Sequence, residues 1–564
     1  MAPPVTLVSI PGNWSFELID SKRSPAGGGP FEAAGQPAGV ALPAPAPMPA
    51  VVTGDDRQLV PVLPRTPRWR GVVGLAAARW PLLVILVVQT ALSLRLIWSN
   101  TAFQDEGLYL RAGHLEWAHW LHHAPVPSFP SYFSGAPVLY PPLGALADSI
   151  GGLAAARLLS LCFMLGVTCL LWATATRLYG QRAALLGAGL FGTLAGAQFL
   201  GGFATYDAMA LFLLALAVWL GVRSAGCGFW ARTALLVTAG ASLAVADAAK
   251  YATTLFAPVA LLAVALAGWR KLGGRACVAA ALTMVCCWLV LVLAAVVAGG
   301  GVYWHGVMTS TLARPHADTP VTTVLRSAYV WTSLILVLAV LGAVLARRGE
   351  SRGKGLPAIL AAAGLLAPIG QASLHTTVGL QKHVVFGAWF AAIAAGYAMA
   401  RLSRVDPGRG WAAVMALPIA ASTLFGSMGQ AAALFRVWPD AAGAISVLRS
   451  AIHSHPGNYL AEDYDVEAYY LRDEVRWPRW SSTYYFKYRG ARGGAPSYEA
   501  AIEHHYFALV ILHSGDTAAT DAQIMADMRQ AGDYRVLARA GRFTIWAARV
   551  PASARAAGGN HAPY

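Results

Sequence analysis

Residues 80–98 read WPLLVILVVQTALSLRLIW, an apolar run of membrane-spanning length with one charged side chain, Arg95. A helix needs roughly 20 mainly apolar residues to cross the hydrocarbon core of a bilayer. Similar runs recur to about residue 432, and 57% of the chain is hydrophobic while 12% is charged. This pattern predicts a polytopic membrane protein and argues against a set of soluble domains of this length.

About eleven transmembrane helices are predicted in an all-α domain over residues 80–435. Lys and Arg number 14 in the loops that are inward if the N-terminus is cytoplasmic, against six on the other side. This asymmetry obeys the positive-inside rule, and an odd number of spans then places the C-terminus outside. The net charge of +15 is spread over these loops, so no nucleic-acid-binding patch is predicted. The expected spans are Trp80–Trp98, Leu153–Ala175, Ala183–Leu200, Tyr206–Gly221, Thr233–Ala248, Thr253–Gly268, Ala276–Ala298, Ala328–Ala346, Leu356–Leu374, Val384–Ala400 and Trp411–Ala432.

The two flanking regions differ from the membrane domain. Residues 1–79 are rich in Pro, Ala and Gly without helical periodicity, which predicts a disordered cytoplasmic tail. Residues 436–564 have the composition of a soluble domain. They predict a small extracytoplasmic α/β domain. Its expected elements are strands over 458–462 and 506–513, helices over 499–503 and 520–530, and a hairpin over 534–547.

The first outward loop, residues 99–152, is longer than a helix connection requires, which is typical of functional loops. It opens with SNTAFQDEGLYLRAGH (99–114), and its mixed Leu, Trp and His positions predict a helix lying in the membrane interface. A loop punctuated by Pro and Gly follows, with a second short helix expected after Pro142. A second long outward loop is expected over 299–327.

Two acidic positions on this outer side are candidates for chemistry, because charges in a membrane domain are costly. The Asp105-Glu106 pair offers a general base, or alternatively an N-cap and a first-turn acid of the interfacial helix. Asp207, in FATYDAMALFLLALAVWL, lies at the outer mouth of the fourth span. It is either a second member of the same site or an acid that meets the positive end of its helix dipole.

The sparse outward cations suit a phosphate headgroup, although each is equally compatible with an interface anchor. Lys250 is also expected to pair with Asp247, three residues before it. Three histidines spaced as one helix face are compatible with a metal, or with simple solvation. The cations are Lys250, Arg314, His316, His375, Lys382 and His383, and the three histidines are His119, His122 and His123.

Five short motifs carry a resemblance to a known family: QDEGLYL (104–110), VLYPPLGAL (138–146), ATYDAMALFLLAL (204–216), AKYATTLFAP (249–258) and LQKHVVFGAWFAA (380–392). Their order and their outward placement resemble the bacterial GT-C glycosyltransferases that use polyprenyl-phosphate sugars, a group with the protein O-mannosyltransferases and the aminoarabinose transferase for lipid A. The resemblance covers residues 80 to about 435. The C-terminal region does not resemble the lectin-like insert of eukaryotic protein mannosyltransferases, so the resemblance does not imply a protein acceptor.

The resemblance implies an inverting transfer of a sugar from a polyprenyl-phosphate donor to a hydroxyl on a glycan, lipid or protein acceptor. Asp105 is then the general base, with Glu106 and Asp207 in support. No cofactor is implied, although a divalent cation is compatible with this chemistry. The resemblance assigns the donor phosphate to Lys250, Lys382 and His383, and the outward position of Arg314 adds this residue to them. Tyr140 is expected either to line the substrate groove, together with His375, or to support the loop.

A different interpretation is a transporter or flippase for a lipid-linked or small polar substrate. That class predicts charges near the bilayer midplane, interrupted helices in matching halves and an internal repeat, none of which the sequence displays. A non-catalytic receptor or assembly factor is a third interpretation, and it leaves the acids around Asp105 unexplained.

Overall fold

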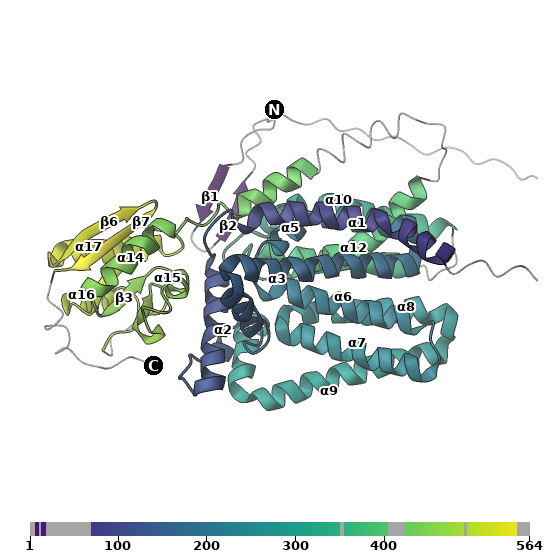
Figure 1. Ribbon diagram of the computed structural model, residues 1–564, viewed down its shortest axis with the longest axis horizontal. Helices are drawn as coiled ribbons and strands as arrows, with labels where there is room; N and C mark the ends of the chain where they lie inside the picture. The colour runs from purple at the N-terminus through teal and green to yellow at the C-terminus, as the bar shows by residue number, and fades with distance from the viewer. Residues whose placement is uncertain are drawn as a thin grey trace, which may run out of the picture. The chain divides into compact units, whose positions relative to one another are not determined.

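The computed structural model describes residues 6–10, 13–17, 69–349, 355–403, 424–489 and 493–549, which are mainly helical (Figure 1). In this described part, nine helices are long and apolar enough to cross a membrane, and a pair bent by 69° makes a tenth if it counts as one span. The chain is a multi-pass membrane protein. The bent pair is α4 (Gln181–Gly192) with α5 (Ala195–Gly201), and the nine spans come from α1 (Trp69–Ile97), α3 (Tyr140–Tyr179), α6 (Tyr206–Ser224), α7 (Phe229–Ala249), η2 (Tyr251–Phe256) with α8 (Ala257–Leu272), α9 (Gly274–Val307), α10 (Val321–Gly349), α11 (Leu356–Ser373) and α12 (Leu380–Leu402).

Nine of the eleven predicted spans are confirmed, and the predicted span Ala183–Leu200 coincides with the bent pair. Most of the eleventh, Trp411–Ala432, lies outside the described residues. The loop expected over 299–327 is shorter than predicted. Helix α9 continues to Val307, and a π-helical turn, η3 (Met308–Leu312), follows it. The backbone at Gly300 is non-helical, with a φ of 65° and a ψ of −164°, so α9 consists of two helical segments joined at a kink.

The N-terminal segment predicted to be a disordered tail contains two short paired strands, β1 (Thr6–Ile10) and β2 (Asn13–Glu17). The remainder of that segment up to residue 68 lies outside the described residues, as do residues 550–564.

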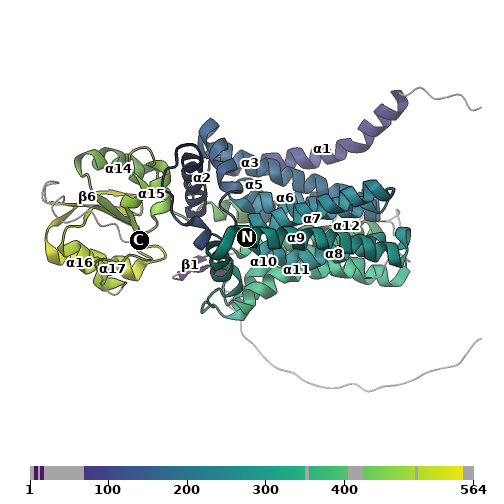
Figure 2. The same cartoon turned by 90° about the horizontal axis from the view of Figure 1, so that it is seen from below.

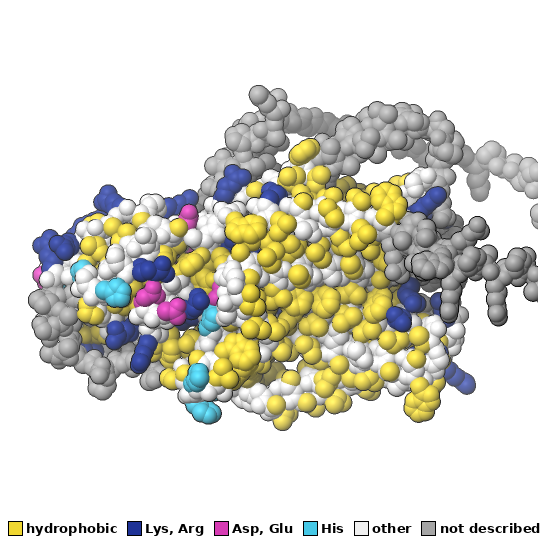
Figure 3. Space-filling view, viewed as in Figure 1, with side chains coloured by type: hydrophobic (Ala, Val, Ile, Leu, Met, Phe, Trp, Pro, Cys, Tyr) yellow, Lys and Arg dark blue, Asp and Glu magenta, His cyan; other side chains and the backbone are white. Residues whose placement is uncertain are grey.

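Small residues let the central helix α12 approach its neighbours closely. A Cβ at Gly396 would lie 2.2 Å from the carbonyl oxygen of Ala183 in α4, so only glycine fits there. Close backbone approach of this kind is the usual way to pack helices in a membrane. In contrast, large apolar side chains on outer helices are exposed, for example Trp230 at 83% and Val297 at 73%. The hydrophobic side chains that cover the helical bundle in Figure 3 are those that a bilayer would solvate.

The first predicted outward loop is largely helical. Its helix α2 (Gln104–His122) confirms the predicted helix, and it runs across the direction of α3, α6 and α7 (Figures 1 and 2). The short turn η1 (Phe129–Ser131) follows it. The second short helix expected after Pro142 is the beginning of α3, which is interrupted by non-helical backbone at Gly151 and Gly152.

The C-terminal region forms the predicted α/β domain around a five-stranded sheet of order β4-β3-β5-β7-β6. Strands β4, β3 and β5 are parallel, whereas β7 pairs antiparallel with β5 and β6. One apolar cluster includes residues of α14 and α15, and a second includes residues of α16 and α17. The elements are α14 (Ala442–Ser454), β3 (Asn458–Ala461), α15 (Tyr464–Tyr470), β4 (Trp480–Ser482), α16 (Ala495–Glu503), β5 (Phe507–Leu512), α17 (Ala518–Ala531), β6 (Tyr534–Ala540) and β7 (Phe543–Ala548).

Candidate active site

Asp105 lies in the first turn of α2, and its carboxylate forms an ion pair with Lys382 at the start of α12. The distance between Lys382 Nζ and Asp105 Oδ2 is 2.5 Å. The side chain of Asp105 is 26% exposed and that of Lys382 is 14% exposed. The carboxylate is therefore anchored by a cation and still accessible to a second molecule.

Asp207, in the first turn of α6, forms a second and fully buried ion pair. Lys250 Nζ lies 2.6 Å from Asp207 Oδ1, and the hydroxyl of Thr205 donates a hydrogen bond to Oδ2. Asp207 is 0% exposed and Lys250 is 5% exposed. The Lys250 ammonium also lies 5.0 Å from the centroid of the Tyr206 ring, a cation–π contact. All of the charge on Asp207 is thus compensated inside the protein.

The pairing of Lys250 with Asp247 expected from their spacing is wrong. Lys250 is the residue after the end of α7 and has extended backbone, with φ of −150° and ψ of 108°. Asp247, still inside the helix, instead accepts a hydrogen bond of 2.8 Å from the indole of Trp288 in α9.

The two ion pairs meet at one end of the helical bundle. The Lys382 ammonium lies 5.7 Å from the ring centroid of Phe203, and the charges of both lysines act on Asp207. Tyr109, one turn after Asp105 in α2, donates a hydrogen bond of 2.9 Å to the hydroxyl of Tyr206 beside Asp207. Helices α2, α6 and α12, with the end of α7, therefore build one site of two acids and two lysines.

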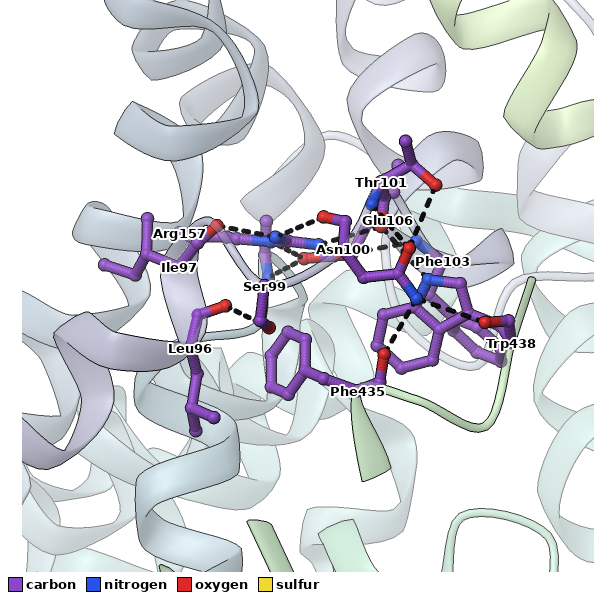
Figure 4. A network of polar contacts seen from close by, with 12 residues as sticks. Leu96, Ile97, Ser99, Asn100, Thr101, Phe103, Glu106, Arg157, Phe435 and Trp438 are labelled. Carbon is purple, nitrogen blue, oxygen red and sulfur yellow. Dashed lines mark hydrogen bonds and ion pairs between the residues drawn. The ribbon is translucent and has the colours of Figure 1, made fainter. Parts of the chain in front are cut away.

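Glu106 is fully buried and forms a bidentate ion pair with Arg157 of α3 (Figure 4). The contacts are 2.8 Å from Nε to Oε1 and 2.7 Å from Nη2 to Oε2. Glu106 also accepts the backbone N–H of Phe103 in a capping box, and that of Ala204 before α6. Its oxygens are thus occupied by contacts that hold α2 against α3 and the start of α6.

Arg157 also fixes the loop between α1 and α2. Its guanidinium donates hydrogen bonds to the carbonyl oxygens of Ile97, Asn100 and Thr101, at 2.7 to 3.2 Å (Figure 4). Arg157 was not among the predicted site residues. Its position at the start of an apolar membrane segment is a usable signal, because a charged side chain there needs a buried partner.

The other candidate residues make contacts of their own. His383 is held by the Gln371 amide, and the charges of Lys250 and Arg314 act on it. Tyr140 is fully buried with its hydroxyl 3.4 Å from that of Ser160, so it supports α3 from inside. His375 lies with its ring centroid 6.2 Å from that of His316.

The histidines of α2 show no metal-binding arrangement. Within the described residues, no group of three or more His, Cys, Asp or Glu side chains is placed to hold a metal ion. His119 instead contacts the carbonyl oxygen of Ala124 at the end of α2.

The C-terminal domain is bound to α2 and α3 by buried polar contacts. Arg111 of α2 forms an ion pair with Asp465 of α15. Asp148 of α3 is contacted by His114 at 2.7 Å and accepts a hydrogen bond from the hydroxyl of Tyr469. The helix that carries Asp105 thus also forms the platform for this domain.

No protein-family model matches the sequence, and no match to a curated protein reaches significance. Solved structures with a similar fold are found. ArnT from Cupriavidus metallidurans in the apo state has a TM-score of 0.56 at 16% identity, and the match covers 85% of this chain and 99% of ArnT. The form bound to undecaprenyl phosphate has a TM-score of 0.52, and that match covers 86% of this chain and 99% of ArnT. The oligosaccharyltransferase AglB from Archaeoglobus fulgidus, in complex with an inhibitory peptide and a dolichol-phosphate, has a TM-score of 0.53 at 13% identity. The match covers 84% of this chain and 75% of AglB.

A mutant of the mycobacterial arabinofuranosyltransferase AftD has a TM-score of 0.50 at 14% identity, covering 83% of this chain and 41% of AftD. These proteins are all GT-C membrane proteins. The chain therefore has the GT-C fold, with the small C-terminal sheet domain described above.

Proposed function

We propose that this chain is a membrane glycosyltransferase that moves a sugar from a polyprenyl-phosphate donor to an acceptor hydroxyl, with Asp105 as general base. The observation that carries the proposal is the accessible Asp105 carboxylate. It is paired with Lys382 and lies beside a second, buried acid–lysine pair. An acid and a cation at one place suit a reaction that removes a proton and releases an anion.

In the proposed reaction, the Asp105 carboxylate takes the proton of the acceptor hydroxyl. The resulting oxygen attacks the anomeric carbon from the face opposite the phosphate, so the configuration inverts. The bond from carbon to the phosphate oxygen breaks, and its electron pair leaves with the polyprenyl phosphate. Because Asp105 is held by Lys382 and its helix by Glu106, the base needs little reorganisation.

The lysines are assigned to the leaving phosphate. Lys382 contacts the base and Lys250 lies beside Asp207, so both ammonium groups are near the reacting centre. Preorganised cations stabilise developing negative charge strongly in a site that excludes water. The proposal assigns this role to protein side chains and requires no cofactor, and unchanged transfer after treatment with EDTA is the expected result.

The ligands of similar folds support the choice of donor. ArnT was determined with undecaprenyl phosphate and AglB with a dolichol-phosphate, and both ligands are polyprenyl phosphates. We assign the same donor class to this chain. We further propose a bacterial cell membrane location with a cytoplasmic N-terminus and the site on the extracytoplasmic face. Labelling of single cysteines from outside intact cells tests that orientation.

The direct test is transfer of radiolabelled sugar from polyprenyl-phosphate donors in membranes that carry Asp105→Asn. We expect transfer to be abolished, with expression and membrane insertion unchanged. Asp473→Asn, an exposed acid-to-amide change in the C-terminal domain, is the matched control. Normal transfer by the Asp105 variant would rule out the mechanism, and movement of the donor across the bilayer without product would favour a transporter.

A further inference from the structure

A cavity of about 330 Å³ opens between the start of α2 and the C-terminal sheet. Phe103 and Gln104, the two residues before Asp105, line one side of it. Its other side is formed by residues that follow the parallel strands β3 and β5, such as Asp463 and Asp516. The carboxyl ends of parallel strands are the usual place for ligands in α/β sheets. The volume lies at the lower end of the range of about 300–1,000 Å³ that is usual for small-ligand pockets.

Glu467 of α15 belongs to the wall of this cavity, and one of its carboxyl oxygens is buried without a partner in the described part of the chain. Its side chain is 2% exposed, and within the described structure its Oε2 atom has no hydrogen-bond partner. Glu462, another carboxylate of the wall, is fully occupied, because it accepts the backbone N–H groups of Gly515 and Thr517. A buried polar atom without a partner is unusual and costly. Glu467 therefore keeps one hydrogen-bonding position that no group of the described structure uses.

Aromatic side chains form much of the remaining wall. Trp438, Tyr484 and Phe543 line the cavity together with Phe103. Flat apolar rings beside a few placed polar groups are the usual composition of a small-ligand site. The apolar C–H face of a sugar ring can pack on such rings while its hydroxyls reach the polar groups.

The cavity wall is rich in carboxyl groups, which are poor partners for an anion. Glu462, Asp463, Glu467 and Asp516 line it, against Arg542 and His513. Burial raises the pKa of Glu467 to about 8, so this carboxyl is mostly protonated at neutral pH and can both donate and accept a hydrogen bond. A neutral hydroxyl group, which also donates and accepts, matches it better than a phosphate or a carboxylate does.

We propose that this cavity binds a neutral sugar unit of the acceptor, with Glu467 hydrogen-bonded to one of its hydroxyls. The inference rests on the proposed function and narrows the acceptor to a glycan or a glycosylated molecule. Its position fits that role, because Phe103 and Gln104 of the cavity wall directly precede Asp105, and the charge of Asp105 acts on Asp463 of the opposite wall.

The test uses the purified full-length chain in detergent and a panel of neutral oligosaccharides built from mannose, galactose, glucose or arabinose. We expect at least one to bind, and Glu467→Ala to weaken the Kd by about tenfold or more. Glu467→Gln should stay within about threefold, since the amide also donates and accepts. Glu503→Ala, at an exposed position of α16, is the control. Tyr484→Ala should weaken binding as well. Because Tyr484 is 37% exposed, this variant should fold, and it tests the cavity even if the Glu467 variant misfolds.

The outcomes separate this inference from the proposed function. Asp105→Asn should keep oligosaccharide binding and lose transfer. Normal transfer by that variant, with binding intact, would contradict the proposed function alone. Binding of basic peptides in place of oligosaccharides, no binding of any panel member, or unchanged binding by both Glu467→Ala and Tyr484→Ala would overturn the assignment of the cavity.

Discussion

Lys382 and Asp105 are 277 positions apart in the sequence, and their side chains form an ion pair of 2.5 Å. The pair joins the first turns of α2 and α12. One ammonium group therefore lies where it can hold the proposed base and also attract an anionic leaving group.

Replacing Lys382 by methionine should lower kcat by about 10²-fold or more, because the leaving phosphate would lose a positioned cation. The KM for the donor should rise as well. Steady-state transfer assays measure both quantities. Lys487→Met, which removes an exposed lysine of the C-terminal domain, is the control. A variant that loses folding stability but keeps its kcat would contradict the catalytic role.

Replacing Lys250 by methionine should destabilise the fold by about 3–5 kcal/mol, because Asp207 would remain buried without its partner. Unfolding in detergent, followed by intrinsic fluorescence, gives the difference. The double variant Lys250→Met with Asp207→Asn should regain most of this stability without regaining activity. Equal losses in the single and double variants would show that the pair is not coupled.

Arg157→Lys should impair the site indirectly. Lysine keeps the charge, but it lacks the planar guanidinium group that contacts both oxygens of Glu106 and the loop carbonyls. We expect a lower unfolding temperature and a kcat reduced by about tenfold, with the donor KM nearly unchanged. Hydrogen exchange should increase in residues 97–106. If exchange there stays as in the unmodified chain, Arg157 does not position the base.

The C-terminal domain should lose stability as the pH rises from about 4.5 to about 8. The folded-state pKa of Glu467 is raised by burial from 4.5 to about 8, so the folded state retains a proton that the unfolded chain releases. Its contribution is fully present below pH 4.5 and is lost as the pH rises through 8. Glu467→Gln should flatten this part of the stability profile, whereas Glu503→Gln should leave it unchanged. A profile with the same slope in the Glu467 variant would contradict the assignment.

The elements set by local sequence were predictable. Each membrane span needs only its own run of apolar residues, and ten such runs coincide with helices or the bent pair. The buried strand β5 and the β6–β7 hairpin were recognisable for the same reason. Neither α15 nor β4 was predicted, because segments of seven and three residues are too short to show a period.

The partners of the charged residues were not predictable, since they depend on how distant helices meet. Lys250 is three residues from Asp247, yet it pairs with Asp207, 43 positions away. The backbone leaves its helical course at Lys250, so the spacing rule for helices no longer applies to its side chain. In the same way, Asp105 was visible as a candidate base, while its contact with Lys382 required the fold.

Glu106 and Arg157 secure the start of α2 from the side of the membrane helices. The cavity at Glu467 is built mostly from the C-terminal domain instead. The proposed base and the proposed acceptor cavity thus lie in separate parts of the chain. Under these two proposals, substitutions in the C-terminal domain would change the acceptor while the residues around Asp105 stay the same.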